Sequence, residues 1–201
     1  MEKRPALLIV DLQNDFCPGG ALPVPEGDRI VPRVNQAIRL FERRGLPILA
    51  SRDWHPRETR HFKEFGGAWP PHCVQGTKGA RFHPGLRLPK RTVVVSKGMD
   101  PDEDSYSAFQ AVTSKGRDLE STLREMGVGD LFICGLATDY CVRATSIDAS
   151  KRGFPVRVLR DAVRGVDLKP GDSEGALGEL KAVGATFVET RRLAKVLPPP
   201  P

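Results

Sequence analysis

Long apolar segments are missing from this chain of 201 residues. The longest unbroken apolar run, Ala6–Val10, has five residues, whereas a helix that crosses a bilayer needs about 20. The preceding Glu2–Arg4 enters this run without the small-residue cleavage site of a secretory signal. We therefore expect a cytoplasmic protein that neither spans nor binds a membrane.

Concentrated charge is also absent. The formal net charge is +6, but the 31 basic residues are scattered, and no block of five or more like charges occurs. Proteins that bind nucleic acids usually gather their basic side chains in one stripe. The charge pattern therefore argues against a nucleic-acid partner and indicates a solvated basic surface.

Cysteines are few, and none of them forms a C-x-x-C pair. The chain has Cys17, Cys73, Cys134 and Cys141. Without a secretory signal we expect no disulfide framework, and a cysteine with a special role is then more often catalytic. Cys134 lies within an apolar run, while Cys17 and Cys73 lie in loop-like sequence, so we interpret these three as structural.

Apolar residues make up 39% of the chain. Along the sequence they alternate between segments with a strand pattern and segments with a helix pattern. Ala6–Val10 is continuously apolar, as in a strand buried on both faces, and Ile30–Arg44 repeats its apolar residues with a helical period. This alternation is typical of a parallel sheet covered by helices on both faces. Further strands are expected at Pro47–Ala50, Thr92–Val95, Leu131–Cys134, Val156–Leu159 and Thr186–Val188, and further helices at Leu119–Met126, Thr138–Arg152 and Ser173–Val183.

We expect one domain over residues 1–201. Residues 51–91 have no clear period, yet they contain both tryptophans and all four histidines of the chain. A long irregular segment of this composition indicates a functional loop. Pro198–Pro201 cannot pack as a helix or a strand, so residues 197–201 are expected to form a frayed tail.

Reactive side chains follow the first four predicted strands. Asp11, Asp53 and Lys97 come at or just after the first three, and a turn at Gly135 leads from the fourth to Cys141. Ligand sites of parallel sheets form at the carboxyl ends of the strands. We therefore expect these four side chains to meet at one edge of the sheet.

Cys141 falls near the start of a predicted helix for which Thr138 and Asp139 are suitable N-cap residues. The partial positive charge of a helix N-terminus favours a thiolate and lowers the pKa of a thiol. Lys97 would add to this effect, and Asp11 could accept the thiol proton. The pattern predicts a nucleophilic cysteine.

A second group of residues suits a metal ion. Asp53 and His55 stand two residues apart at a strand end, and His61 and His72 follow in the same irregular segment. Carboxylate oxygens and neutral imidazoles are ligands for Zn, Fe or Mn. His83 has no comparable surroundings, and we interpret it as structural.

These residues stand in stretches that resemble the nicotinamidases (pyrazinamidases) among the isochorismatase-like cysteine hydrolases. The D-x-H and W-P-x-H-C stretches are typical of the metal-dependent nicotinamidases, whereas the Asp, Lys and Cys set is shared more widely. The matching stretches cover most of the chain: D-L-Q-N-D-F-C-P-G-G from Asp11, D-W-H from Asp53, W-P-P-H-C-V-Q-G-T from Trp69, S-K-G from Ser96 and G-L-A-T-D-Y-C-V from Gly135.

The resemblance implies a three-layer α/β/α fold with a six-stranded parallel sheet. It also implies an oxyanion hole made by the backbone N–H groups of Ala137 and Cys141, next to a cis peptide bond between Leu136 and Ala137. The implied catalytic triad is Asp11, Lys97 and Cys141, and the implied ligands of one divalent metal ion are Asp53, His55 and His72, with His61 as a further ligand in some relatives. The residues expected to contact the substrate are Phe16, Trp69, Tyr106 and Leu136.

The resemblance implies hydrolysis of nicotinamide to nicotinate and ammonia through a thioester, as in NAD salvage. Activity on pyrazinamide and other aromatic amides stays open. The acidic segment Met99–Asp104 departs from the family's pattern. Two alternatives stay open: a hydrolase on the same scaffold that acts on a carbamoyl, ureido or vinyl-ether substrate, and a binding protein that holds a metal structurally. Homo-oligomer formation and the source of the water that cleaves the thioester stay open too.

Overall fold

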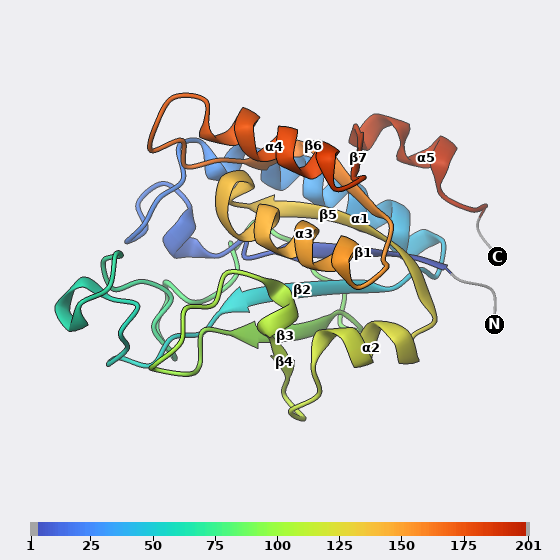
Figure 1. Ribbon diagram of the computed structural model, residues 1–201. Helices are drawn as coiled ribbons and strands as arrows, with labels where there is room; N and C mark the ends of the chain where they lie inside the picture. Colours follow the sequence, from blue (N-terminus) through green and yellow to red (C-terminus); the bar gives the residue numbers. More distant parts are fainter. Residues whose placement is uncertain (1–3, 200–201) are drawn as a thin grey trace.

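The computed structural model describes residues 4–199, which form one central sheet between two layers of helices (Figure 1). The sheet has seven strands in the order β4-β3-β2-β1-β5-β6-β7. All neighbouring strands run parallel except β4, which pairs with β3 in the antiparallel sense. The strands are β1 (Arg4–Val10), β2 (Ile48–Asp53), β3 (Val93–Lys97), β4 (Val112–Thr113), β5 (Val128–Leu136), β6 (Val156–Arg164) and β7 (Thr186–Val188).

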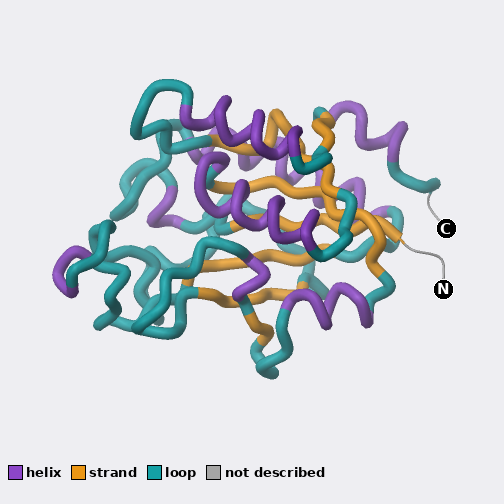
Figure 2. The backbone as a smooth tube through the Cα atoms, in the orientation of Figure 1, coloured by secondary structure: helices purple, strands orange, loops and turns teal. Residues whose placement is uncertain are grey.

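Helices cover both faces of the sheet, as Figure 2 shows, and this confirms the predicted three-layer α/β/α fold. α2, α3 and α4 pack on one face, and α1 and α5 pack on the other. The helices are α1 (Val31–Arg43), α2 (Leu119–Glu125), α3 (Arg143–Lys151), α4 (Asp172–Ala182) and α5 (Leu193–Val196), with a π turn, η5 (Thr138–Val142), directly before α3, and short 3-10 turns η1 (Asn14–Phe16), η2 (Gly27–Ile30), η3 (Lys63–Phe65), η4 (Ala108–Gln110) and η6 (Thr190–Arg192).

The prediction of a six-stranded, wholly parallel sheet needs one correction. The six predicted strands are present and parallel, but β4 adds a seventh at the edge of the sheet, antiparallel to β3. With only Val112 and Thr113 in it, β4 is too short to show the alternation by which a strand is recognised in a sequence.

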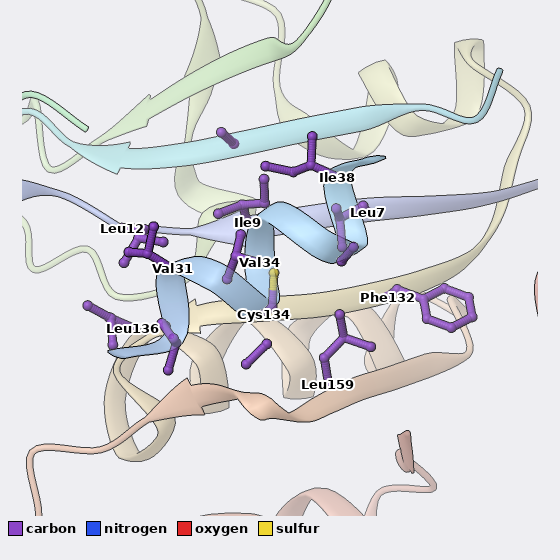
Figure 3. Packing of buried hydrophobic residues seen from close by; sticks show 14 of the residues in the cluster. Leu7, Ile9, Leu12, Val31, Val34, Ile38, Phe132, Cys134, Leu136 and Leu159 are labelled. Atoms are coloured by element: carbon purple, nitrogen blue, oxygen red, sulfur yellow. The ribbon is translucent and has the colours of Figure 1, made fainter. Parts of the chain in front are cut away.

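The two faces of β1 bury alternate residues in two separate cores. Leu7 and Ile9 pack with α1 on one side (Figure 3), whereas Leu8 and Val10 pack on the side of α2, α3 and α4. Successive side chains of a strand point to opposite faces. A strand that is buried on both faces must therefore be continuously apolar, which explains the run at Ala6–Val10.

The long segment between β2 and β3 gathers beside the carboxyl ends of the strands (Figure 1). It contains one short turn, η3, and is folded back on itself by isolated strand-like pairs, His55 with Val74 and Phe62 with Trp69. A further pair, Gln13 with Phe82, joins it to the segment after β1. Within residues 4–199, no helix is both long enough and apolar enough to cross a membrane.

Two further expectations differ from the structure. The helix expected from Thr138 begins as a π turn, and neither Thr138 nor Asp139 caps it with its side chain. The expected frayed tail at 197–201 is wrong in its first part, because Leu197 is buried beside α1 and Arg44 Nε donates to the carbonyl of Pro198 at 2.7 Å. Residues 200–201 lie outside the described part of the chain.

Replacing Phe41 on α1 tests the core of this face. Phe41 is completely buried and meets the ring of Phe132 edge-on, with 5.4 Å between the ring centroids. Phe41→Ala should lower the free energy of unfolding by about 3–5 kcal/mol, because it removes a buried ring and leaves a cavity. Phe65→Ala, at a ring that is 42% exposed, should change it by less than about 1 kcal/mol. Urea denaturation measures both, and equal losses would contradict this assignment of the core.

Candidate active site

The order of the strands brings the four reactive side chains to one place. Lys97 ends β3, Asp53 ends β2, Asp11 follows β1, and Cys141 follows β5, and these are four adjacent strands. Asp53 and Lys97 are direct partners in the pairing of β2 with β3. Since parallel strands end on the same edge, their terminal side chains meet there.

Asp11, Lys97 and Cys141 are in contact. Lys97 Nζ lies 2.9 Å from Asp11 Oδ2 and 3.5 Å from Cys141 Sγ. Lys97 also forms an ion pair with Asp53 and donates to the carbonyl of Ser105 at 3.1 Å. One oxygen from each carboxylate and the Cys141 sulfur lie within 4.8 Å of one another. The site therefore joins one ammonium, two carboxylates and one thiol, and all four side chains are buried.

Burial and these neighbours shift the pKa values of the charged groups. Burial opposes the charge on Lys97, but Asp11 and Asp53 outweigh it and hold the Lys97 pKa well above its usual value. Burial acts against the charge on Asp53 as well, yet Lys97 and the histidines lower its pKa. Burial raises the pKa of Asp11 despite Lys97. A carboxylate with a raised pKa is a better proton acceptor.

The expectation of a lowered pKa at Cys141 is wrong for this arrangement. Burial raises the pKa of the Cys141 thiol well above its usual value; Lys97 lowers it, and Asp11 and Asp53 raise it further. Desolvation of the buried sulfur is the largest of these effects and opposes the thiolate form. A thiol in such surroundings needs a nearby base to form the thiolate.

The backbone around Asp11 fixes its carboxylate. Asp11 has a φ of +44°, a left-handed conformation that is uncommon for residues other than glycine and occurs often at functional sites. Its N–H donates to the carbonyl of Ser51 at 3.2 Å, and the Ser51 hydroxyl donates to Asp11 Oδ1 at 2.7 Å. Ser51 was not predicted as part of the site, because its role follows from the pairing of β1 with β2.

The turn between β5 and Cys141 has the expected cis peptide bond, between Leu136 and Ala137. Gly135, just before it, has a φ of +115°, and a side chain there would collide with the backbone of Val10. Among residues 4–199, no acceptor takes the N–H of Ala137. Both Ala137 and Cys141 line the cavity described below.

The histidines form a second cluster beside the first. One ring nitrogen each from His55, His61 and His72 lies within 4.8 Å of the other two. Asp53 Oδ2 lies 3.7 Å from His55 Nε2 and 3.9 Å from His72 Nε2. The structure thus brings together all four residues that the sequence suggested as metal ligands.

This cluster fits a divalent metal ion. Within the described residues, neither ring nitrogen of the buried His55 has a hydrogen-bond partner, and such a loss is costly unless something else binds there. His72 Nδ1 donates to the carbonyl of Pro70 at 2.8 Å, which leaves Nε2 with its lone pair. Burial lowers the pKa of His72 to about 4, so its ring is neutral at pH 7. Neutral imidazoles with a carboxylate are typical zinc ligands.

One cavity connects the two clusters. Cys141 lines it together with Asp53, His61 and His72. All four residues expected to contact the substrate also line it: Phe16, Trp69, Tyr106 and Leu136. Further lining residues that the sequence did not reveal are Leu22, Val24, Ser105, Tyr140 and Val166.

The walls of this cavity are mainly aromatic and apolar. The rings of Trp69 and Tyr140 meet edge-on, with 5.2 Å between centroids, and Trp69 Nε1 donates to the Tyr106 hydroxyl at 2.9 Å. The ionisable groups of the two clusters also line this cavity, namely Cys141, Asp53, His61 and His72. A small, flat, mostly apolar ligand with one reactive group suits such a space.

Comparison with known proteins identifies the family. The Isochorismatase domain matches residues 5–192. This chain belongs to the isochorismatase family. A nicotinamidase of Escherichia coli (strain K12) is 44% identical to this family member over 201 residues, covering 90% of this chain and 93% of that protein.

Solved structures agree with this assignment. A pyrazinamidase of Pyrococcus horikoshii in complex with zinc has a TM-score of 0.86 and 52% identity, covering 92% of this isochorismatase-family chain and 99% of its own. PnC1 from L. infantum in complex with nicotinate has a TM-score of 0.84 and 36% identity, covering 94% of both chains. Both similarities extend over nearly the whole fold.

Asp139 holds one wall of the cavity in place. Its two carboxylate oxygens accept the N–H groups of Val166 at 2.9 Å and Asp167 at 2.8 Å. Val166 lines the cavity, and it belongs to the loop between β6 and α4. The expectation that Asp139 caps a helix is therefore replaced by a role in fixing this loop.

Replacing Asp139 should loosen that wall. We expect Asp139→Ala to raise KM for the substrate of this site by about tenfold, since each lost hydrogen bond to a charged group is worth about 1.5–3 kcal/mol and the loop adjusts in part. Asp161→Ala is the matched control, because Asp161 likewise accepts the N–H of Thr190, at 2.8 Å, but lies outside the cavity. Steady-state kinetics distinguish the two, and an unchanged KM in Asp139→Ala would contradict the role given to Asp139.

Proposed function

We propose that this protein hydrolyses nicotinamide to nicotinate and ammonia. The observation that carries the proposal is the single cavity that Cys141 and the histidine cluster line together, which suits a flat ring with a reactive amide at one end. Similarity to nicotinamidases over nine-tenths of the chain supports the same conclusion. The similarity to a pyrazinamidase supports pyrazinamide as a second substrate.

The first half-reaction forms a thioester on Cys141. Asp11 accepts the thiol proton as the sulfur attacks the carboxamide carbon, and the carbonyl oxygen becomes an oxyanion. The carbon–nitrogen bond then breaks, and the leaving amine takes the proton from Asp11 and departs as ammonia. The raised pKa of Asp11 suits a group that first accepts this proton and then returns it.

The second half-reaction releases nicotinate. Asp11, again ionised, takes a proton from a water molecule, whose oxygen attacks the thioester carbon. The carbon–sulfur bond breaks, the Cys141 sulfur takes the proton back from Asp11, and the product acid leaves as nicotinate after losing its own proton to water. Atoms balance over the cycle, because one water is consumed for each ammonia released.

Lys97 and two backbone amides stabilise the charges that develop. Lys97 Nζ contacts both Asp11 and the Cys141 sulfur, so its fixed positive charge favours the thiolate while the proton moves. The N–H groups of Ala137 and Cys141 would donate to the oxyanion, and donors that are already in place at this point reduce the barrier without reorganisation.

The residues that would hold the metal ion are Asp53, His55, His61 and His72. A bound divalent ion supplies a Lewis acid that can take the ring nitrogen of the substrate as a ligand. The chemistry of these ligands suits Zn, Fe or Mn, and the similarity to a zinc-bound pyrazinamidase supports zinc. Phe16, Trp69 and Tyr106 would flank the ring and direct its carboxamide toward Cys141. Holding the substrate in a reactive geometry lowers the entropic part of the barrier.

Removing the nucleophile tests this function. Cys141→Ala should lower kcat for nicotinamide by about 10⁴-fold or more, because no thioester can form. Cys134→Ala is the matched control, since Cys134 is completely buried within β5 and outside the cavity; its kcat/KM should stay within about twofold. Ammonia release measures both. Turnover retained by Cys141→Ala would exclude the covalent route, and a wild-type protein active only on carbamoyl or ureido compounds would contradict the substrate assignment.

Removing the metal ion tests the second cluster. Chelation should lower kcat/KM for nicotinamide by about tenfold or more, and added Zn²⁺ should restore it. His55→Ala should contain much less metal per chain by elemental analysis. His83→Ala, at a ring that accepts the N–H of Gly85 and lies outside the histidine cluster, should contain as much as the wild type. Equal metal content in the two variants would show that the histidine cluster is not the binding site.

A further inference from the structure

The acidic segment Met99–Asp104 ends beside the histidine cluster. Asp104 Oδ1 lies 2.5 Å from His61 Nδ1. The His61 side chain is only 4% exposed, whereas that of Asp104 is 65% exposed. A surface carboxylate thus contacts the Nδ1 atom of a buried imidazole.

We propose that Asp104 is a positioning residue of the metal site, which holds His61 as a metal ligand. The proposal rests on the metal site of the proposed function. A hydrogen on Nδ1 that is donated to Asp104 leaves the lone pair on Nε2, the nitrogen that is then available to a metal ion. Carboxylates that orient histidine ligands in this way fix the tautomer and the direction of the ring.

His72 is oriented in the same way, but by a neutral carbonyl group in place of a carboxylate. His72 Nδ1 donates to the carbonyl of Pro70 at 2.8 Å, so its Nε2 is likewise left for the cluster. The ring of His61 also stacks on that of His55, with 4.7 Å between centroids and an interplanar angle of 18°. Stacking fixes the plane of the His61 ring but not which nitrogen carries the hydrogen. The hydrogen bond to the Asp104 carboxylate places that hydrogen on Nδ1.

The backbone near Asp104 is fixed well enough for this role. Its carbonyl accepts Gln110 Nε2 at 3.1 Å. Nearby, the carbonyl of Pro101 accepts the N–H of Arg60 at 2.8 Å, which joins the acidic segment to the segment that carries His61. The next residue, Ser105, accepts Lys97 Nζ through its carbonyl at 3.1 Å. Two consecutive residues therefore support the histidine cluster and the catalytic lysine.

Metal affinity tests the proposal directly. Asp104→Ala should weaken Zn²⁺ binding by about 10- to 100-fold, measured by competition with a chromophoric chelator. Asp104→Asn keeps an oxygen acceptor and should recover part of this loss. Glu103→Ala is the matched control: it removes the same charge one residue away, and Glu103 makes no side-chain hydrogen bond or ion pair within residues 4–199. Its affinity should stay within about twofold of the wild type.

A double variant separates positioning from general electrostatic attraction. In a His61→Ala background, Asp104→Ala should cause no further loss of Zn²⁺ affinity, because its partner is gone. The visible spectrum of the Co²⁺-loaded protein should change in Asp104→Ala and not in Glu103→Ala.

Equal affinities of the Asp104→Ala and Glu103→Ala variants would overturn the proposal, and so would an additive loss in the double variant. Either result would leave the metal site itself intact. A wild-type protein that binds no Zn²⁺ would instead contradict the metal site of the proposed function and this inference with it.

Discussion

The ammonium group of Lys97 joins the two halves of the active site. It contacts Asp11 and Cys141, which carry out the proposed chemistry, and Asp53, which faces the histidines. Two carboxylates buried this close together repel each other, and desolvation adds to the cost of their charge. Lys97 offsets both effects, so its position at the end of β3 is a condition for the whole arrangement. The pairing of Asp53 with Lys97 in the sheet supplies that position.

Much of this arrangement follows from the sequence because parallel strands are easy to recognise and end on one edge. The run Ala6–Val10 predicted β1, and this placed Asp11 at the carboxyl end of that strand, where the structure has it. The edge strand β4 could not be predicted, since two residues carry no pattern. Lys97 and Asp53 were expected at the same edge, but their ion pair was not predicted, because it depends on the register between β2 and β3.

The pKa of Cys141 could not be predicted from the residues next to it in the sequence. The place of this residue at the start of a helix predicted a nucleophile with a lowered pKa, whereas burial and two carboxylates raise that pKa. Those carboxylates come from β1 and β2, far away in the sequence. Tyr140 and Val166 were missed as walls of the cavity for a similar reason: an aromatic or apolar side chain has the same appearance in a sequence whether it faces a core or a ligand.

The loop between β6 and α4 is separate from the catalytic groups in one important respect. It gives the cavity Val166, and Asp139 ties it to the turn that carries Cys141. The groups that would transfer protons or bind the metal ion all lie on other segments. Exchange of this loop during evolution could therefore change which molecules enter while the reaction itself is preserved, and a library of loop variants is a natural starting point for redesigning selectivity on this scaffold.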